Sequence, residues 1–380
     1  MQFMSGAMGW ADTIILAMAP LGIITAIVAA IRVGGPSWLK AVIGRARENL
    51  AVAEAELMSS TSQEVCELWN GREIVRCMGS PSVTEFICLL PRNGNASGGT
   101  PEIVQEIVIT RNLSLDAPNI SVNAHRQTSR GELRIVAAFG TILQLGVLVY
   151  SGFATYHPAL KFSKDDSPIE SYAYPCAAVG TFILVAGMML CAHVVDSSTE
   201  EKRFRPKPET NMRVRMVWLQ QTKTVNDQVF GSFAVYAKDD QPFITTSRRP
   251  QKAELGQSRP ATDDGEYPTP GDASLTIQVK TVIGAMITLI GFVIQFVGLR
   301  GLHWSASITQ LGAVLVMVFL KAWVRRGLAT PPKAISLPPG YELDWFARTL
   351  GKVDEAPWNG EALKKDQPVH GRLRAMETHT

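Results

Sequence analysis

The sequence is poor in charge and lacks the short motifs that carry chemistry. Asp, Glu, Lys and Arg make up 19% of the 380 residues, below the ~25% of an average soluble chain. We find no phosphate-binding glycine loop ending in Lys-Ser/Thr, no nucleophile elbow and no paired-histidine metal helix. The net charge of +3 is too small to suggest nucleic-acid binding. No catalytic, cofactor-binding or metal-binding residue is predicted, and an enzyme is the least supported class.

Cysteine is also scarce, and its spacing argues against a disulfide framework or a zinc site. Cys66, Cys77 and Cys88 form an odd set, while Cys176 and Cys191 lie within a long apolar run. The sequence has no C-x-x-C pair and no histidine at ligand spacing. We therefore expect buried free thiols.

What the sequence does contain is long apolar runs. Each reaches or approaches the ~20 residues that a helix needs to cross a bilayer. None has an Asp, Glu, Arg or His at its middle, whereas a soluble helix of this length normally turns a charged face to water. The runs are residues 13–31, 135–156, 172–195, 282–299 and 305–324. We predict a membrane all-α bundle of five transmembrane helices, with the lipid bilayer as its first partner.

The basic residues beside these runs give the predicted orientation, because Lys and Arg near a span tend to stay in the cytoplasm. They cluster after the first and third runs, before the second and fourth, and after the fifth. The opposite side has only Lys161, Lys164 and Arg300. An extracytoplasmic N-terminus and a cytoplasmic C-terminus satisfy every flank. The sequence has no signal for a particular membrane or oligomeric state.

A cleaved signal peptide is the alternative for residues 13–31. Ala29 and Ala30 would supply small residues at the cleavage site, and residues 32–132 would then lie outside the cytoplasm. N-glycosylation acceptors in that stretch would fit such a placement. They are Asn95, Asn112 and Asn119. No basic residue precedes the run, so we favour the transmembrane reading without glycosylation.

Small and polar residues recur every three or four positions in the predicted spans. Such stripes let backbones approach closely and form interhelical hydrogen bonds, since lipid provides no hydrophobic drive for helix association. The predicted helix-packing stripe comprises Thr281, Gly284, Thr288, Gly291, Gln295, Gly298, Gly180, Gly187, Thr141, Gln144, Gly22 and Ala26. For Gln144, Gln295 and Gln310 we favour helix-to-helix hydrogen bonds over a polar pathway. A coupled carrier usually has an ionisable residue near the midplane, and none is present.

Two long loops and a tail connect the spans. We predict a first segment at 1–34, a cytoplasmic α/β region at 35–132, transmembrane hairpins at 133–196 and 273–326, a cytoplasmic β-rich region at 197–246, a disordered linker at 247–272 and a cytoplasmic tail at 327–380. Strands are expected at 73–78, 85–90, 103–110, 213–221 and 232–236, and short helices at 65–69 and 341–350. Neither loop alone is large enough for a good core, so we predict that both combine into one mixed α/β cytoplasmic unit.

A single helix is predicted from Pro36 to about Ser59, directly after the first span. It has a basic first half and an acidic second half. Its apolar seam repeats at intervals of three and four. The juxtamembrane seam comprises Leu39, Ile43, Ala46, Leu50, Ala53 and Leu57. We favour a helix packed on its own domain, and the alternative is self-association or contact with anionic lipid headgroups.

Several strings resemble a group of filamentous-fungal multi-spanning membrane proteins. They are Gly9-Trp10-Ala11-Asp12, Ala19-Pro20-Leu21-Gly22-Ile23, Ala30-Ile31-Arg32-Val33-Gly34, Ile43-Gly44-Arg45-Ala46 and Val65-Cys66-Glu67-Leu68. The resemblance lies mainly in the first ~90 residues. Some members of the group carry ankyrin repeats, but this chain lacks the corresponding 33-residue period. The resemblance implies a polytopic membrane protein and provides no functional residue.

These observations favour a polytopic membrane protein that presents a cytoplasmic interaction or regulatory module. A protein partner would bind the cytoplasmic domain or the tail, where Trp345 is a candidate either for anchoring that partner or for packing against the domain. The alternative is a transporter or channel subunit that uses the polar stripes.

Overall fold

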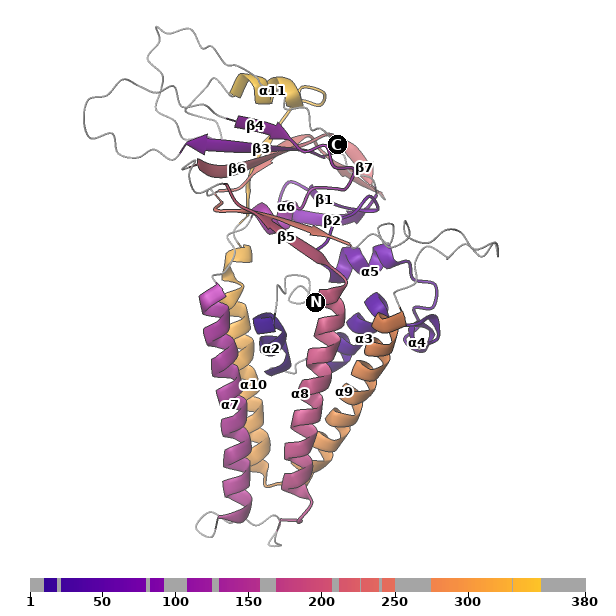
Figure 1. The fold of residues 1–380 in the computed structure, drawn as a ribbon, viewed down its shortest axis with the longest axis vertical. Helices are drawn as coiled ribbons and strands as arrows, with labels where there is room; N and C mark the ends of the chain where they lie inside the picture. Colours follow the sequence, from indigo (N-terminus) through magenta and orange to yellow (C-terminus); the bar gives the residue numbers. More distant parts are fainter. Residues whose placement is uncertain are drawn as a thin grey trace, which may run out of the picture. The chain divides into compact units, whose positions relative to one another are not determined.

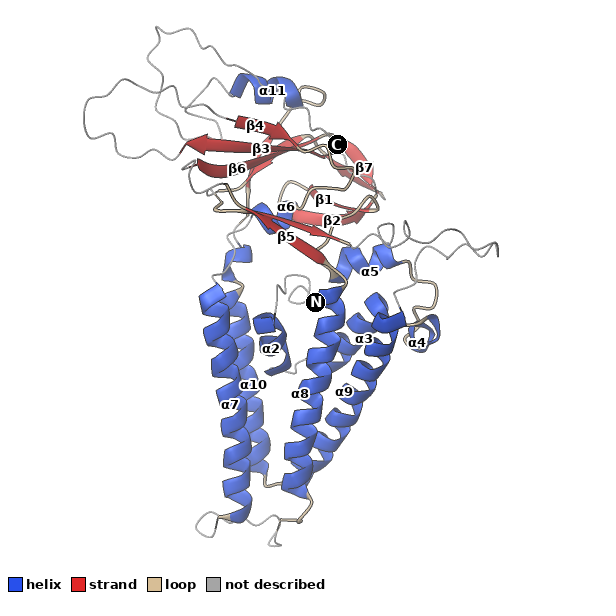
Figure 2. Cartoon of the chain, viewed as in Figure 1, coloured by secondary structure: helices blue, strands red, loops and turns tan. Residues whose placement is uncertain are grey.

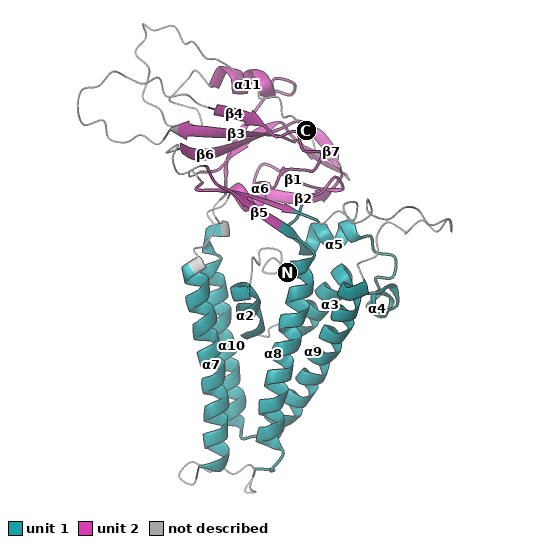
Figure 3. Ribbon diagram, viewed as in Figure 1, with its two compact units in different colours: residues 1–60, 127–200, 248–329 teal, residues 61–126, 201–247, 330–380 magenta. Residues whose placement is uncertain are grey.

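The chain forms two units, each with its own core. The computed structural model describes residues 10–18, 22–79, 83–91, 108–124, 130–157, 169–206, 212–225, 227–238, 241–249, 275–329 and 331–349. The helical unit comprises residues 1–60, 127–200 and 248–329, and the β unit comprises residues 61–126, 201–247 and 330–380 (Figure 3). The predicted linker at 247–272 lies almost wholly outside the described residues.

Long apolar helices dominate the helical unit (Figures 1 and 2). Among the described residues, four helices are long and apolar enough to cross a membrane. They are α7 (Arg130–Tyr156), α8 (Ala173–Ser197), α9 (Leu275–Gly301) and α10 (Trp304–Val324). These correspond to the last four predicted spans. The chain therefore has the composition and helix lengths of a polytopic membrane protein.

The four helices run alternately up and down, which gives the unit two distinct ends. Glycines of α8 meet α9 in antiparallel order, from Gly180 beside Gln295 to Cys191 beside Gly284. Arg326, just after α10, bonds Glu132 at the start of α7. The loop end, as we call it, is where α7 and α9 begin and α8 and α10 end. The hairpin end is the opposite end, where residues 157–172 and 302–303 join the helices.

Helices α8 and α9 touch backbone to backbone. A Cβ at Gly291 would lie under 3.0 Å from backbone atoms of Ile183 and Leu184, and one at Gly298 would meet Ala177. All the stripe residues of α9 are buried, and Gly180 and Gly187 of α8 are buried against them. The absence of side chains at these positions therefore sets the separation of the two helices.

Interhelical hydrogen bonds satisfy the glutamines of the stripe, and the threonines bond within their own helices. Gln295 Nε2 donates to Thr181 Oγ1 across the α8–α9 contact at 2.9 Å. Gln144 Nε2 donates to Gln310 Oε1 across the α7–α10 contact at 3.1 Å. Thr141 donates to the carbonyl of Ala137 in its own helix. The glutamine side chains thus bond to neighbouring helices within the described part of the unit.

The first predicted span differs from the expectation of one continuous helix. Two short helices, α2 (Trp10–Met18) and α3 (Ile23–Gly34), replace it. Gly22 precedes α3 with a φ of +88°, a left-handed conformation that favours glycine and interrupts a right-handed helix. Gly22 is therefore a turn residue and is exposed, whereas Ala26 is buried as the stripe predicted. Pro20 lies outside the described residues.

The start of α2 and the end of α3 both lie at the loop end. Asp12 in α2 contacts Arg325, just after α10. A Cβ at Gly34 would meet Val194 near the end of α8 and Ile277 near the start of α9. Between these points, Met18 lies beside Gly140, about 15 Å along α7 from its start at 1.5 Å per residue. The segment enters the unit to about half its depth and returns to the same end.

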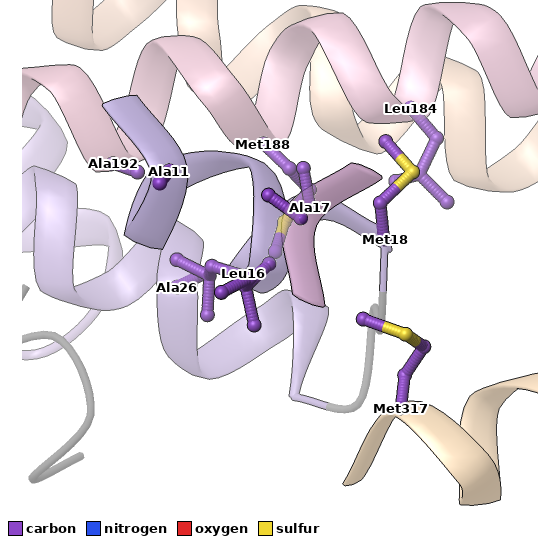
Figure 4. Packing of buried hydrophobic residues seen from close by; sticks show 11 residues of the cluster. Ala11, Leu16, Ala17, Met18, Ala26, Leu184, Met188, Ala192 and Met317 are labelled. Carbon is purple, nitrogen blue, oxygen red and sulfur yellow. The ribbon is translucent and has the colours of Figure 1, made fainter. Parts of the chain in front are cut away.

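This re-entrant segment fills the space between the two helix pairs. Residues of α2 pack with Ala26, with Ala137 of α7, with α8 and with α10 in one core cluster. Figure 4 shows Met18 between Leu184 of α8 and Met317 of α10. The helical unit is thus a bundle of two antiparallel pairs with α2 packed against both.

The predicted helix from Pro36 to Ser59 is also divided. The structure has α4 (Ser37–Val42) and α5 (Leu50–Leu57), with Gly44 at a φ of +74° between them. Ala53 and Leu57 are buried against α3 and α8, as the favoured reading expected of the seam. Leu39, Ile43 and Leu50 are half-buried and Ala46 is exposed. A continuous seam is therefore wrong, because the left-handed glycine turns the chain between its halves.

One antiparallel sheet forms the centre of the β unit. Its strand order is β11-β9-β6-β3-β4. The strands are β3 (Val83–Pro91), β4 (Val108–Arg111), β6 (Met212–Gln220), β9 (Phe233–Tyr236) and β11 (Lys333–Ser336). The first loop, the second loop and the tail each contribute strands. The structure thus shows the predicted mixing of both loops, and it adds β11, which the sequence reading missed.

Both faces of this sheet are covered. On one face the ring of Phe346, from α11 (Glu342–Thr349), stacks on Phe86 with centroids 4.3 Å apart. On the other, Trp218 packs with Trp69 and Ile120. The elements around the sheet are β1 (Val65–Trp69), β2 (Ile74–Met78), α6 (Ile120–Ala124), β5 (Glu200–Phe204), β7 (Lys223–Val225), β8 (Gln228–Phe230) and β10 (Ile244–Arg248), and η3 (Arg326–Ala329) follows α10 in the helical unit.

The predicted short helix at 65–69 is wrong, because these residues form strand β1. All five residues of β1 are buried, and they pair in register with β2 from Val65–Met78 to Trp69–Ile74. Thr61 and Glu64 have the spacing of a capping box for such a helix, but the Thr61 hydroxyl donates to the carbonyl of Ala117 instead. Pairing with a neighbouring strand outweighs a weak local capping signal.

We expect Gly291→Ala to destabilise the helical unit, because the added Cβ collides with the backbone of α8. Overpacking of this kind costs about 1–3 kcal/mol, seen as a lower Tm in thermal unfolding of the detergent-solubilised chain. Gly312→Ala in α10 is the matched control, since nothing lies within 4 Å of its Cβ position. Equal Tm changes in both variants would contradict the α8–α9 contact described above.

Candidate functional site

Among the described residues of the helical unit, the charged side chains with the least exposure lie at the loop end. Asp12 is 1% exposed, Arg32 is 2% exposed and Glu54 is fully buried. Each one is satisfied by ionic or hydrogen-bonding partners from a distant part of the chain. Buried charge is costly unless it is paired, so these contacts are the strongest candidates for a functional arrangement.

Asp12 and Arg325 connect the re-entrant segment to the last long helix. Their Oδ1 and Nη2 atoms are 2.8 Å apart. Asp12 lies at the edge of the first apolar run in the sequence, and the structure buries it inside the unit. Three hundred and thirteen positions separate the partners, so no local pattern indicates the pair. The pair holds the start of α2 at the loop end.

Arg32 at the end of α3 is the centre of a second cluster. Its guanidinium donates to both carboxylate oxygens of Glu48, at 2.5 to 3.0 Å, and to Glu56 at 2.6 Å. Glu54 of α5 accepts from Ser60 and pairs with Arg249. A fork-shaped guanidinium binds carboxylates in this two-point manner. The acidic second half of the predicted juxtamembrane helix therefore serves to neutralise internal cations.

The exposed tryptophan and tyrosine side chains lie at two levels of the helical unit, whereas exposed phenylalanines occur along the helices between them. Tyr156, Tyr172 and Trp304 are exposed at the hairpin end, and Trp10 and Trp323 at the loop end. Trp304 and Trp323 are about 28 Å apart along α10 at 1.5 Å per residue. This spacing is close to the ~30 Å thickness of a hydrocarbon core, and aromatic residues favour its two interfaces.

Two asparagines join the first and second loops within the β unit. Asn119 Nδ2 donates to the Ser247 carbonyl and its Oδ1 accepts from the Ser247 N–H, both at 2.9 Å. Asn123 bonds both backbone groups of Thr245 in the same way at 2.8 Å. These side chains, one just before α6 and one within it, imitate a strand pairing with β10. Sequence reading missed this role, because it is specified by a partner far along the chain.

The same contacts bear on the glycosylation acceptors. A glycan attaches to the amide nitrogen, and that of Asn119 is buried and bonded to Ser247. Asn112 donates its amide to Glu85 Oε2 at 2.6 Å. Asn95 lies outside the described residues. The unglycosylated reading of the three acceptors stays a prediction.

The cysteines of the β unit are buried thiols. Burial raises the pKa of Cys66 to about 11 and that of Cys88 to about 12, from an ordinary value of 9.0. Burial also raises the pKa of Cys77. These groups stay protonated at neutral pH, and a nucleophilic cysteine needs the thiolate. Among the described residues, no group of three or more His, Cys, Asp or Glu side chains is placed to hold a metal ion.

Comparison with family models, curated proteins and solved structures gave no match to the chain. The resemblance to fungal membrane proteins stays a prediction. The arrangement of the site therefore rests on its own geometry, which is a re-entrant helix pair held by buried ions.

We expect Asp12→Asn to lower the stability of the helical unit, because it leaves the Arg325 guanidinium without its carboxylate. Breaking a buried pair costs about 3–5 kcal/mol, and the partial exposure of Arg325 places the loss near the lower value. Thermal unfolding of Asp12→Asn, Arg325→Gln and the double variant measures the coupling. The double variant should lose less than the sum of the two single losses.

Arg326→Gln is the matched control for this cycle. Its pair with Glu132 is about half exposed on both sides, and such pairs contribute at most about 1 kcal/mol. Strictly additive losses in the Asp12–Arg325 cycle would show that the pair does not hold α2 in place.

Proposed function

We propose that this polytopic membrane protein holds a β-rich interaction module on the cytoplasmic side of a bilayer. The five-stranded sheet is the observation that carries the proposal. Loops that only link helices need no common core, whereas here both loops and the tail build one sheet. A helical anchor combined with a folded module is typical of a protein that presents a binding surface at a membrane.

Four crossings are part of this proposal. Since α2 and α3 enter and leave at the loop end, the segments before α2 and after α10 lie on the same side of the bilayer. The charge bias is unchanged, because the basic residues beside α7 to α10 lie mainly at the loop end. This arrangement replaces the expected extracytoplasmic N-terminal segment with a cytoplasmic one.

A transporter or channel subunit is the alternative. It was suggested by the polar stripes, but Gln144, Gln295 and Gln310 bond to each other or to Thr181 across helix contacts. These bonds support a structural role for the glutamines. The interaction module is therefore the better supported function.

Cysteine accessibility tests the number of crossings. We expect Trp10→Cys and Leu115→Cys to react with a membrane-impermeant maleimide from one side of sealed vesicles, and Glu170→Cys from the other. All three positions are exposed, and the parent chain is the control because its described cysteines are buried or half-buried. Labelling of Trp10→Cys together with Glu170→Cys would support five crossings instead.

Photo-crosslinking in native membranes tests the interaction module. Leu113 and Leu115 are exposed in the β unit, with 75% and 78% of their surface accessible, and neighbouring exposed apolar side chains favour a contact surface. A photoreactive amino acid at Leu115 should give discrete adducts with a protein partner. The same probe at Arg72, an exposed position of the β1–β2 turn, is the control.

Leu113→Ser should reduce the adducts formed at position 115 severalfold without changing the amount of protein in the membrane. Adducts of equal yield at positions 72 and 115, or none at either, would count against a module that binds through this surface. Solute flux through the reconstituted chain that is lost on Gln295→Leu would favour the transporter alternative.

A further inference from the structure

Helix α4 leaves the helical unit with its apolar side chains uncovered. None of its six residues is buried. Trp38 is 60% exposed and Val42 is 74% exposed, and their spacing of four puts both on one helix face. In Figure 1, α4 lies on the outer side of α3, beside the upper end of α9. Burial against the described residues therefore does not account for this face.

The unpaired charge around α4 is predominantly positive. Glu48 and Glu56 are bound by Arg32, and Glu54 by Ser60 and Arg249. Lys40 and Arg47 have no ion pair with any of the described residues, and the Arg45 side chain is about half exposed. The internal pairing of the acids thus leaves Arg47 exposed and Lys40 half-buried, neither with an acidic partner among the described residues.

The position of α4 along the bundle is that of a membrane interface. It follows α3 after two residues, and Gly34 at the end of α3 lies against Val194 of α8 and Ile277 of α9. The exposed Trp10 and Trp323 lie at the same loop end. Tryptophan with an apolar face and neighbouring cations is the pattern of a helix that lies in the headgroup region.

We propose that α4 and the following turn form a binding surface for anionic phospholipid headgroups. Trp38 and Val42 insert into the boundary between headgroups and acyl chains, while Lys40, Arg45 and Arg47 contact the lipid phosphates and carboxylates. Charge complementarity and continuity with the lipid-facing surface of α9 identify the occupant as the bilayer. The inference rests on the proposed membrane insertion of α7 to α10.

A site-specific fluorescent amino acid tests the inference in the full chain, without replacing native cysteines. The probe is placed at Val42, at Leu289 in the middle of α9, or at Leu115 in the β unit, and the chain is reconstituted into nanodiscs. Phosphatidylcholine is the neutral lipid, phosphatidylserine is titrated in, and brominated acyl chains quench any probe that reaches them. We expect quenching at Leu289 in every lipid, none at Leu115, and quenching at Val42 that rises with phosphatidylserine.

Lys40→Gln with Arg47→Gln tests the role of charge. We expect the pair to raise the phosphatidylserine fraction needed for half-maximal quenching at Val42 by at least about fivefold, since each cation near an anionic surface contributes about that factor. Arg72→Gln with Lys238→Gln removes the same charge from exposed positions of the β unit and should change nothing.

Each other outcome overturns the inference. If the Val42 probe stays unquenched while the Leu289 probe is quenched, α4 does not bind lipid, although the proposed membrane insertion of α7 to α10 still holds. If quenching at Val42 does not depend on the phosphatidylserine fraction, or if the charge variant has no effect, α4 does not bind anionic headgroups specifically. An unquenched Leu289 probe would contradict the proposed membrane insertion, and with it the inference about α4. Shielding of the Val42 probe only after addition of soluble protein would assign α4 to a protein partner.

Discussion

Within a bilayer every polar group must find its partner inside the protein, and the helical unit is organised around this constraint. The Gly22 carbonyl, where the chain turns between α2 and α3, accepts from both Ala26 N–H and Thr25 Oγ1. Gln295 and Gln144 each reach a partner on another helix. Among the described residues of this unit, the buried charges lie at the loop end, where carboxylates and guanidinium groups pair. Because these needs are met internally, the outer surface of the long helices can remain apolar.

Sequence patterns predicted best those elements whose conformation is determined mainly by one local property of the sequence. Helices α7 to α10 follow from uninterrupted apolar length, and the α9 stripe from Thr281 to Gly298 lies where its spacing indicated. Strands β3, β6 and β9 coincide closely with runs of apolar and β-branched residues. For these segments local composition and tertiary surroundings favour the same conformation, so the sequence alone is informative.

Other features depend on partners that no local pattern reveals. Asp12 lies at the edge of an apolar run, and only the position of Arg325 explains its burial. The breaks before α3 and after α4 need a left-handed glycine at Gly22 and Gly44, whose effect on a helical pattern is visible only once φ is known. Strand β1 had a weak capping signal, which its pairing with β2 overrides. Tertiary contact decided each of these cases.

The order in which the sheet's strands occur along the chain has a consequence for biosynthesis. Strand β3 cannot pair with β6, its central partner, until the ribosome has synthesised the α7–α8 hairpin that lies between them in the sequence. The edge of β9 stays open until β11 emerges after α10. An unpaired strand edge is prone to aggregation, so the nascent polypeptide carries a vulnerable intermediate through most of its translation. A premature stop codon between Val324 and Lys333 would leave that edge permanently exposed, and quality control would meet a protein with all its long helices but an unfinished sheet.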